Sequence, residues 1–99
     1  MQLIALRTLR LFWRKHPQAE KPLRFWHELV SASEWRGPAD VKDMFGSAVD
    51  VLGNNRVVFD IAGNKYRLVA RISYRFKCVQ IKFVGTHREY DDIDAETIR

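Results

Sequence analysis

The residues best suited to chemistry in this chain are a histidine and a tyrosine in one short segment. His87 and Tyr90 both lie in Gly85–Tyr90, which directly follows a strand-like stretch. Histidine is the side chain whose ordinary pKa lets it donate or accept a proton near neutrality. A phenol beside several cations can be acidified, or it can stack on a base. With arginines nearby to fork onto phosphate oxygens, such a set suits holding and cleaving a phosphodiester.

Cleavage of RNA without a metal ion sets requirements that the neighbouring residues meet. One group takes the proton from the 2′-OH, another protonates the leaving 5′-oxygen, and fixed cations stabilise the phosphate. Arg67 and Lys82 are candidate cations, and Asp60 either forms an ion pair with Arg67 or orients it. From spacing alone two plainer readings stay open. The cations can form an ordinary solvated face, and His87 can be a turn or capping residue.

Two predicted hairpins place the basic side chains on one face of a sheet, which we call the front. Gly63-Asn64 is a strong signal for a tight hairpin, and Tyr74–Lys77 forms a four-residue loop to the next strand. Side chains alternate between the faces of a strand, so the opposite face, the back, is apolar. The expected back pairs are Val57/Ala70, Phe59/Leu68, Ile61/Tyr66, Ile72/Val79, Ala70/Ile81 and Leu68/Phe83. The expected front pairs are Arg56/Arg71, Asp60/Arg67, Arg71/Gln80 and Val69/Lys82.

The rest of the chain predicts an α+β fold in a single domain, residues 1–99. A short strand, Gln2–Ile4, precedes two helices whose apolar residues recur at helical spacing. The strands of the sheet are expected at roughly Arg56–Ala62, Lys65–Ser73 and Cys78–Val84, while Val49–Leu52 either begins a strand or lies in a loop. The helices are expected at about Leu6–His16, ended by Pro17, at about Lys21–Ser33, and at Ala39–Phe45. The two long helices form a hairpin that packs, with the short third helix, on a small antiparallel sheet.

The composition of the chain limits the partners and cofactors that can be expected. The 99 residues carry a net charge of +5, which favours a polyanionic partner: nucleic acid, an anionic membrane surface or an acidic protein segment. Cys78 is the single cysteine, so neither an intramolecular disulfide nor a cysteine-based zinc site is expected. The three histidines lack metal-ligand spacing and the glycine-rich phosphate loops are missing, so we expect neither a metal nor a cofactor. No targeting or membrane-spanning segment is evident, which predicts a cytoplasmic protein.

Several runs of residues, taken together and in order, resemble those of a known protein family. They are residues 63–68, 79–83 and 83–91, the residues Leu9, Phe12, Trp13 and His16-Pro17, and the residues Trp35, Pro38, Val41-Lys42 and Phe45. In these runs the chain resembles the HigB family of bacterial toxins. The resemblance extends over essentially the whole sequence, and the Thr-His-x-Glu-Tyr-Asp run after Gly85 is its most specific part.

The resemblance implies a RelE-like fold and an endoribonuclease that cuts mRNA, typically while the mRNA is translated in the ribosomal A site. It also implies a HigA-type antitoxin with a helix-turn-helix, whose complex with the toxin binds operator DNA. On this basis His87 is the general acid or base, Arg67 stabilises the phosphate, and Lys82 holds phosphate or eases ionisation of Tyr90. Supporting contacts to RNA are expected from Arg56, Arg71, Lys65 and Lys42.

Two other functions fit the same scaffold. A gyrase-poisoning toxin would bind a topoisomerase without hydrolysing anything, since a fold does not fix a function. A degenerate module would bind only RNA or an antitoxin. The ordered set of Arg67, Lys82, His87 and Tyr90 argues against the degenerate module, because a decayed copy has no reason to keep it.

Overall fold

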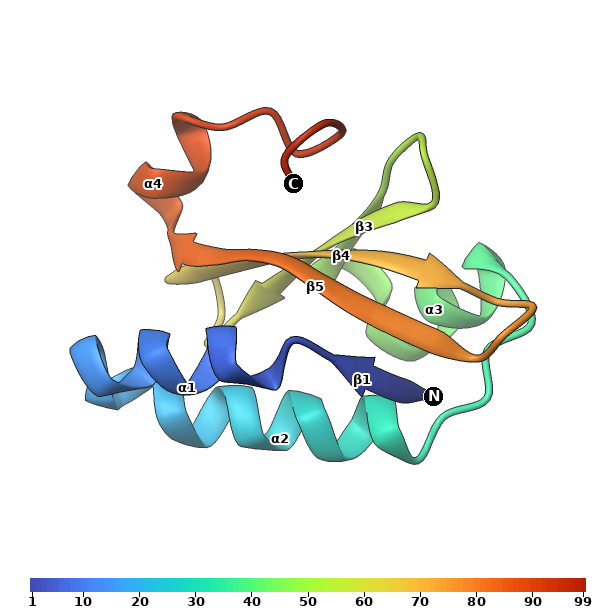
Figure 1. The fold of residues 1–99 in the computed structure, drawn as a ribbon, viewed down its shortest axis with the longest axis horizontal. Helices are drawn as coiled ribbons and strands as arrows, with labels where there is room; N and C mark the ends of the chain where they lie inside the picture. The colour runs from blue at the N-terminus through green and yellow to red at the C-terminus, as the bar shows by residue number, and fades with distance from the viewer.

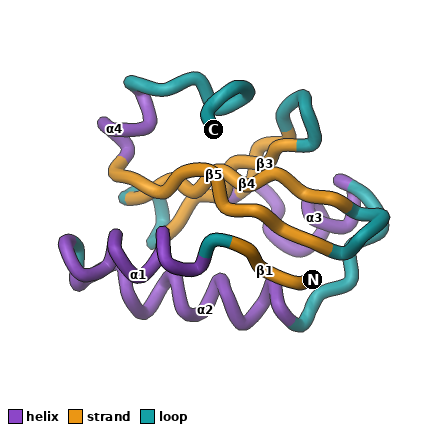
Figure 2. Tube along the Cα trace, in the orientation of Figure 1, coloured by secondary structure: helices purple, strands orange, loops and turns teal.

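A five-stranded sheet forms the middle layer of the protein (Figures 1 and 2). The computed structural model describes residues 1–99, and the strand order is β1-β5-β4-β3-β2. β1 runs parallel to β5, and the other neighbours are antiparallel. The strands are β1 (Gln2–Ile4), β2 (Val49–Val51), β3 (Arg56–Ile61), β4 (Tyr66–Ser73) and β5 (Cys78–Thr86). The predicted α+β class is confirmed, and so is the short strand Gln2–Ile4, which joins the sheet parallel to β5. Of the two alternatives for Val49–Leu52, the strand is correct.

Two long helices lie side by side under one face of the sheet (Figure 1). α1 (Leu6–Lys15) ends just before Pro17, which cannot continue a helix, and α2 (Glu20–Ser31) buries a stripe of apolar residues. α3 (Pro38–Phe45) begins at a proline and ends at Gly46, whose φ of 58° suits glycine. None of the helices is both long and apolar enough to cross a bilayer.

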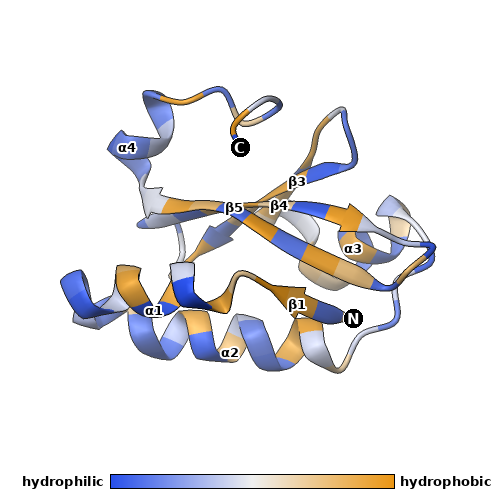
Figure 3. Ribbon diagram, in the orientation of Figure 1, coloured by the Kyte–Doolittle hydropathy of each residue, from blue (hydrophilic) through white to orange (hydrophobic).

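The main core lies between these helices and the back of the sheet. Phe59 is fully buried at its centre, and the ring of Trp26 meets it edge-on at a centroid distance of 5.3 Å. Phe45 and Trp35 complete the aromatic group at 5.0 and 6.4 Å from Phe59. Figure 3 shows the corresponding alternation of apolar and polar residues along β5 and α2. This apolar layer covers the back of the sheet, so the polar side chains of the strands lie on the front.

A second, smaller apolar cluster lies on the front, which the sequence did not predict. Val58 and Val69 are buried there against Ala95, in the last residues of the chain. The C-terminal segment, residues 92–99, folds back over this part of the sheet after α4 (His87–Asp91), as Figure 1 shows. Partly buried side chains complete the cluster: Leu52, Phe83, Tyr90, Ile93 and Ile98.

The predicted register is correct for the first hairpin and for the beginning of the second. All expected pairs of β3 with β4 are present, and β5 begins as predicted. Beyond Ala70/Ile81 the prediction is wrong, because Lys82 is an extra residue in a bulge. The pairs that follow are Val69/Phe83, Leu68/Val84, Arg67/Gly85 and Tyr66/Thr86. The bulge moves Phe83 from the back to the front and places Gly85 opposite Arg67.

Candidate active site

Arg67 joins three other predicted site residues at one end of the front. Its guanidinium donates a hydrogen bond from Nη1 to Asp60. Nη2 lies 3.1 Å from Nε2 of His87. The guanidinium carbon also lies 5.5 Å from the centroid of the Tyr90 ring, within cation–π range. The Arg67 side chain is only 15% exposed, so the group is held in place rather than freely solvated.

The sheet positions this arginine through residues on both neighbouring strands. Asp60 lies directly across from it on β3, and Gly85 lies across from it on β5. A Cβ on Gly85 would come within 2.5 Å of the Phe83 ring and 3.2 Å of the Glu89 side chain. Glycine is therefore required here because the Phe83 ring occupies the space beside it. The close approach keeps α4 near the sheet and near Arg67.

A capping box fixes the start of α4, which carries the two candidate proton-transfer groups. The Thr86 hydroxyl accepts from the Glu89 N–H at 3.2 Å, and the Glu89 carboxylate accepts from the Thr86 N–H at 2.8 Å. The hydrogen bond from the Thr86 backbone holds the pKa of the Glu89 carboxyl below its usual value. The backbone N–H of His87 also donates to the Lys65 carbonyl at 3.2 Å, which ties the helix to the tip of the β3–β4 hairpin.

The contacts of His87 favour one tautomer of the neutral ring. A guanidinium has only donors, so in that tautomer Nε2 accepts from Arg67 and the ring proton is on Nδ1. Nδ1 lies 3.6 Å from the carboxylate of Asp91, one helical turn later. The side chain of His87 is 46% exposed, so a substrate can reach it. The Nε2 lone pair thus lies at the surface, where it accepts from Arg67.

The environment of Tyr90 bears on one of the two roles that the sequence left open for it, an acidified phenol or a ring that stacks on a base. Burial raises the pKa of Tyr90, and the carboxylates of Asp50, Asp91 and Asp60 raise it further, while only Arg67 opposes the shift. The phenol is therefore protonated at neutral pH, where it can donate a hydrogen bond but cannot act as a base.

The structure also places the remaining predicted residues. Lys82 lies half-buried in the β5 bulge, without a hydrogen bond or an ion pair. Lys65 is exposed at the hairpin tip beside His87, and Arg71 is exposed on the front of β4. Lys42 lies on α3, where its amine donates to the Val49 carbonyl at 3.1 Å. Lys42 thus makes a contact within the fold and does not join the group around Arg67.

Arg56 is the clearest departure from the expected basic front. Its side chain is buried, with the residue only 8% exposed. Nη1 donates to the carbonyls of Ala95, at 3.2 Å, and Ile98, so this arginine holds the C-terminal segment on the sheet. The expectation of an exposed Arg56 is wrong, because the front is covered where this residue lies.

Two features of the site were not predicted from the sequence: the helix formed by residues 87–91, and the position of Asp91 beside His87. The pattern Thr86-x-x-Glu89 is a capping-box signature, and it would have predicted the helix. A helix would in turn have placed Asp91 one turn from His87. No three His, Cys, Asp or Glu side chains gather in a way that could hold a metal ion.

The sequence of this chain matches a known protein family. Residues 19–93 match the family described as HigB_toxin, the RelE-like toxic component of a toxin-antitoxin system. The match spans most of the chain and includes all of the residues around Arg67. The chain belongs to the HigB toxin family.

Curated relatives of this HigB-family toxin bear consistent names. The mRNA interferase toxin HigB of Escherichia coli strain K12 is 28% identical over 96 residues, which cover 96% of this chain and 92% of the relative. The mRNA interferase HigB of Shigella flexneri gives the same figures. The mRNA interferase HigB of Escherichia coli O6:H1 is 25% identical over 81 residues, 81% of this chain and 79% of the relative.

Proposed function

We propose that this HigB-family toxin is an endoribonuclease that cleaves mRNA, with its active site around Arg67, His87 and Tyr90. One observation carries the proposal: the Nη2 of Arg67 and the Nε2 of His87 lie 3.1 Å apart, at the solvent-accessible end of the front of the sheet. This arrangement puts a phosphate-binding cation and a proton acceptor side by side. The names of the relatives, mRNA interferases, support the same reaction.

We assign His87 the role of base, because Nε2 carries the lone pair when the ring proton is on Nδ1. In the absence of RNA its Nε2 lone pair accepts from Arg67. When a phosphate oxygen takes over the Nη2 donor of Arg67, Nε2 is free to take the proton of the 2′-OH. The 2′-oxygen then attacks the phosphorus and the bond to the 5′-oxygen breaks, which leaves a 2′,3′-cyclic phosphate. Asp91 near Nδ1 stabilises the imidazolium that forms.

Tyr90 is the candidate donor for the leaving 5′-oxygen. Its raised pKa keeps the phenol protonated, and its ring packs against Arg67 on one side and lies 6.4 Å from the Phe83 ring. Asp60 holds the Arg67 guanidinium so that Nη2 is directed at the site. Lys82 and Lys65 add positive charge for the RNA backbone. The proposed reaction uses side chains alone and needs no metal ion.

The partners follow from the family and from charge. A toxin of a toxin-antitoxin system has an antitoxin partner, and we propose one of the HigA type, with operator DNA bound only through the complex. We further propose that the toxin acts in the cytoplasm on mRNA engaged by the ribosome. The net charge of +5 supports this, since ribosomal RNA presents a dense array of phosphates. Binding should therefore weaken steeply as salt concentration rises.

Toeprinting on translating ribosomes tests the proposal. Wild-type protein should give new mRNA 3′ ends at the A-site codon, and His87→Ala should lose most of them. His27→Ala is the matched control, because His27 lies on α2, on the opposite side of the sheet. Intact mRNA with wild-type protein that still arrests growth would refute the proposal and favour gyrase poisoning or a binding-only role.

A further inference from the structure

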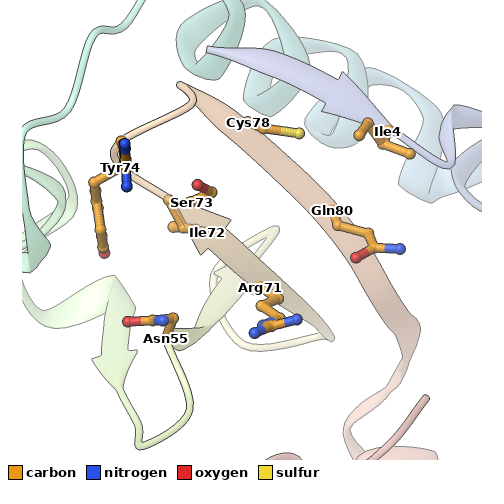
Figure 4. Close-up of a pocket in the computed structure, with 9 residues that line it drawn as sticks. Ile4, Asn55, Arg71, Ile72, Ser73, Tyr74, Cys78 and Gln80 are labelled. Atoms are coloured by element: carbon orange, nitrogen blue, oxygen red, sulfur yellow. The ribbon is translucent and has the colours of Figure 1, made fainter.

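A hollow of about 490 Å³ lies on the front of the sheet, at the end away from His87 (Figure 4). It lies over β4, β5 and β1, and the loop before β3 borders it. Figure 4 shows Arg71 and Gln80, a cross-strand pair, on its floor, with Tyr74 and Asn55 to one side. Neither the Arg67 group nor the C-terminal segment contributes to its lining.

The lining of this hollow suits an anion with polar edges. It contains two arginines, Arg71 and Arg75, and no acidic residue. Neither arginine forms a salt bridge, and the guanidinium of Arg75 lies over the Phe76 ring at 5.4 Å. Asn55 and Gln80 add amide groups that can donate and accept hydrogen bonds. An arginine that forms no salt bridge can donate two hydrogen bonds to one phosphate. The amide groups can form hydrogen bonds with the edge of a base.

The spacing relates the hollow to the proposed active site. Arg67 and Arg71 lie on the same strand and the same face, four residues apart. At about 3.3 Å per residue their backbones are about 13 Å apart, a distance that a short run of nucleotides spans. The C-terminal segment covers Val69 between them. An RNA strand that joins the two sites would pass on the β5 side, where it meets the half-buried, unpaired Lys82 and the exposed Gln80.

We propose that this hollow is a second RNA subsite, which holds the mRNA backbone a few nucleotides away from the bond that is cleaved. The proposal rests on the proposed nuclease function and adds a place for the strand outside the reacting bond. Arg71 and Arg75 bind the phosphates there, and Gln80 and Asn55 contact the nucleotide between them. The subsite contributes binding of the mRNA strand, whereas the Arg67 group contributes the chemistry.

Cys78 is a built-in probe of this subsite. It is the single cysteine of the chain and lines the hollow, half-buried. Toxin is bound to ribosomes programmed with mRNA that carries a 2′-O-methyl group at the cleavage site, so that no cleavage occurs. Alkylation of Cys78 by iodoacetamide is then followed by mass spectrometry, with ribosomes lacking mRNA as the reference. We expect the mRNA to slow alkylation several-fold.

The variant Arg71→Gln makes the test specific. It should restore most of the alkylation rate and raise KM for mRNA cleavage several-fold, with kcat changed little. Arg36→Gln is the matched control, since Arg36 pairs with Asp40 at the start of α3. Full Cys78 reactivity on mRNA-loaded ribosomes, with wild-type cleavage intact, would overturn the subsite alone. Protection by the cognate antitoxin but not by mRNA would also overturn it, because the hollow would then bind the protein partner. Absence of cleavage by wild-type protein would instead count against the proposed function.

Discussion

Arg56 and Arg67 lie on neighbouring strands and face the same side of the sheet, yet their surroundings differ. Arg56 donates to backbone carbonyls of the C-terminal segment and is buried. Arg67 contacts side chains that can bind or move a proton: Asp60, His87 and Tyr90. The comparison teaches that an arginine on a basic face cannot be assigned to RNA until its partners are known. The predictions below test this difference, starting with the largest effect.

Removal of the Arg67 guanidinium should have the largest effect on activity. Arg67→Gln loses the phosphate contact and releases both His87 and Tyr90, so we expect cleavage to fall by about 10²–10³-fold. The measurement is the single-turnover rate on translated mRNA. Arg67→Lys keeps the charge but cannot donate two parallel hydrogen bonds to a phosphate, so it should recover only a small part of the lost cleavage rate. A rate within a few-fold of wild type for Arg67→Gln would contradict the assigned role.

Replacement of Arg56 should instead reduce stability. Arg56→Met leaves two carbonyls without their donor, so the free energy of unfolding should fall by about 1–3 kcal/mol in urea denaturation. RNA affinity should keep its dependence on salt, because no phosphate contact is lost. A slope of log K against log salt that falls by about one would show that Arg56 binds a phosphate after all.

The cap of α4 should have a smaller and pH-dependent effect. Thr86→Ala should lower the local stability of α4 by about 1 kcal/mol, visible as faster hydrogen exchange of the α4 amides. The Glu89 carboxyl has a lowered pKa in the folded state, so its contribution is present above the usual glutamate pKa of about 4.3 and is lost as pH falls through the lower folded value. Protection that did not change in this acidic range would argue against the cap.

The smallest expected effect concerns the ionisation of a single group, the Tyr90 phenol. Its folded-state pKa is raised, so the phenol should stay protonated at neutral pH and should ionise only above the ordinary value of about 10. The associated stability is present below that value and is lost as pH rises through the folded pKa. The difference between ultraviolet titrations of wild type and Tyr90→Phe isolates this group. Ionisation below pH 10 would restore the earlier interpretation of an acidified tyrosine.

The sequence predicted the layers of the fold because hydrophobic periodicity and turn residues are local signals. The register of β3 with β4 followed from the Gly63-Asn64 turn and the alternation of side chains. The same alternation failed at Lys82, because a bulge depends on how the sheet packs and has no strong sequence signal. That single residue moved Phe83 to the front and made Gly85 the partner of Arg67.

Part of the group around Arg67 was predicted from the sequence, but its contacts were not. Arg67, His87 and Tyr90 were identified through the family resemblance, and the structure brings them together. The burial of Arg56 was not predictable, because the return of the C-terminal segment over the front is a long-range contact. The raised pKa of Tyr90 was missed for the same reason, since it depends on packing and on carboxylates from other elements.

The central claim is that Arg67 and His87 act as one unit in mRNA cleavage, and a double-mutant cycle tests it most directly. Single-turnover cleavage on translating ribosomes is measured for wild type, Arg67→Gln, His87→Ala and the double variant. Residues that act as a unit give a double variant about as slow as the slower single variant. Losses that multiply in the double variant, or a single variant that cleaves at the wild-type rate, would contradict the claim.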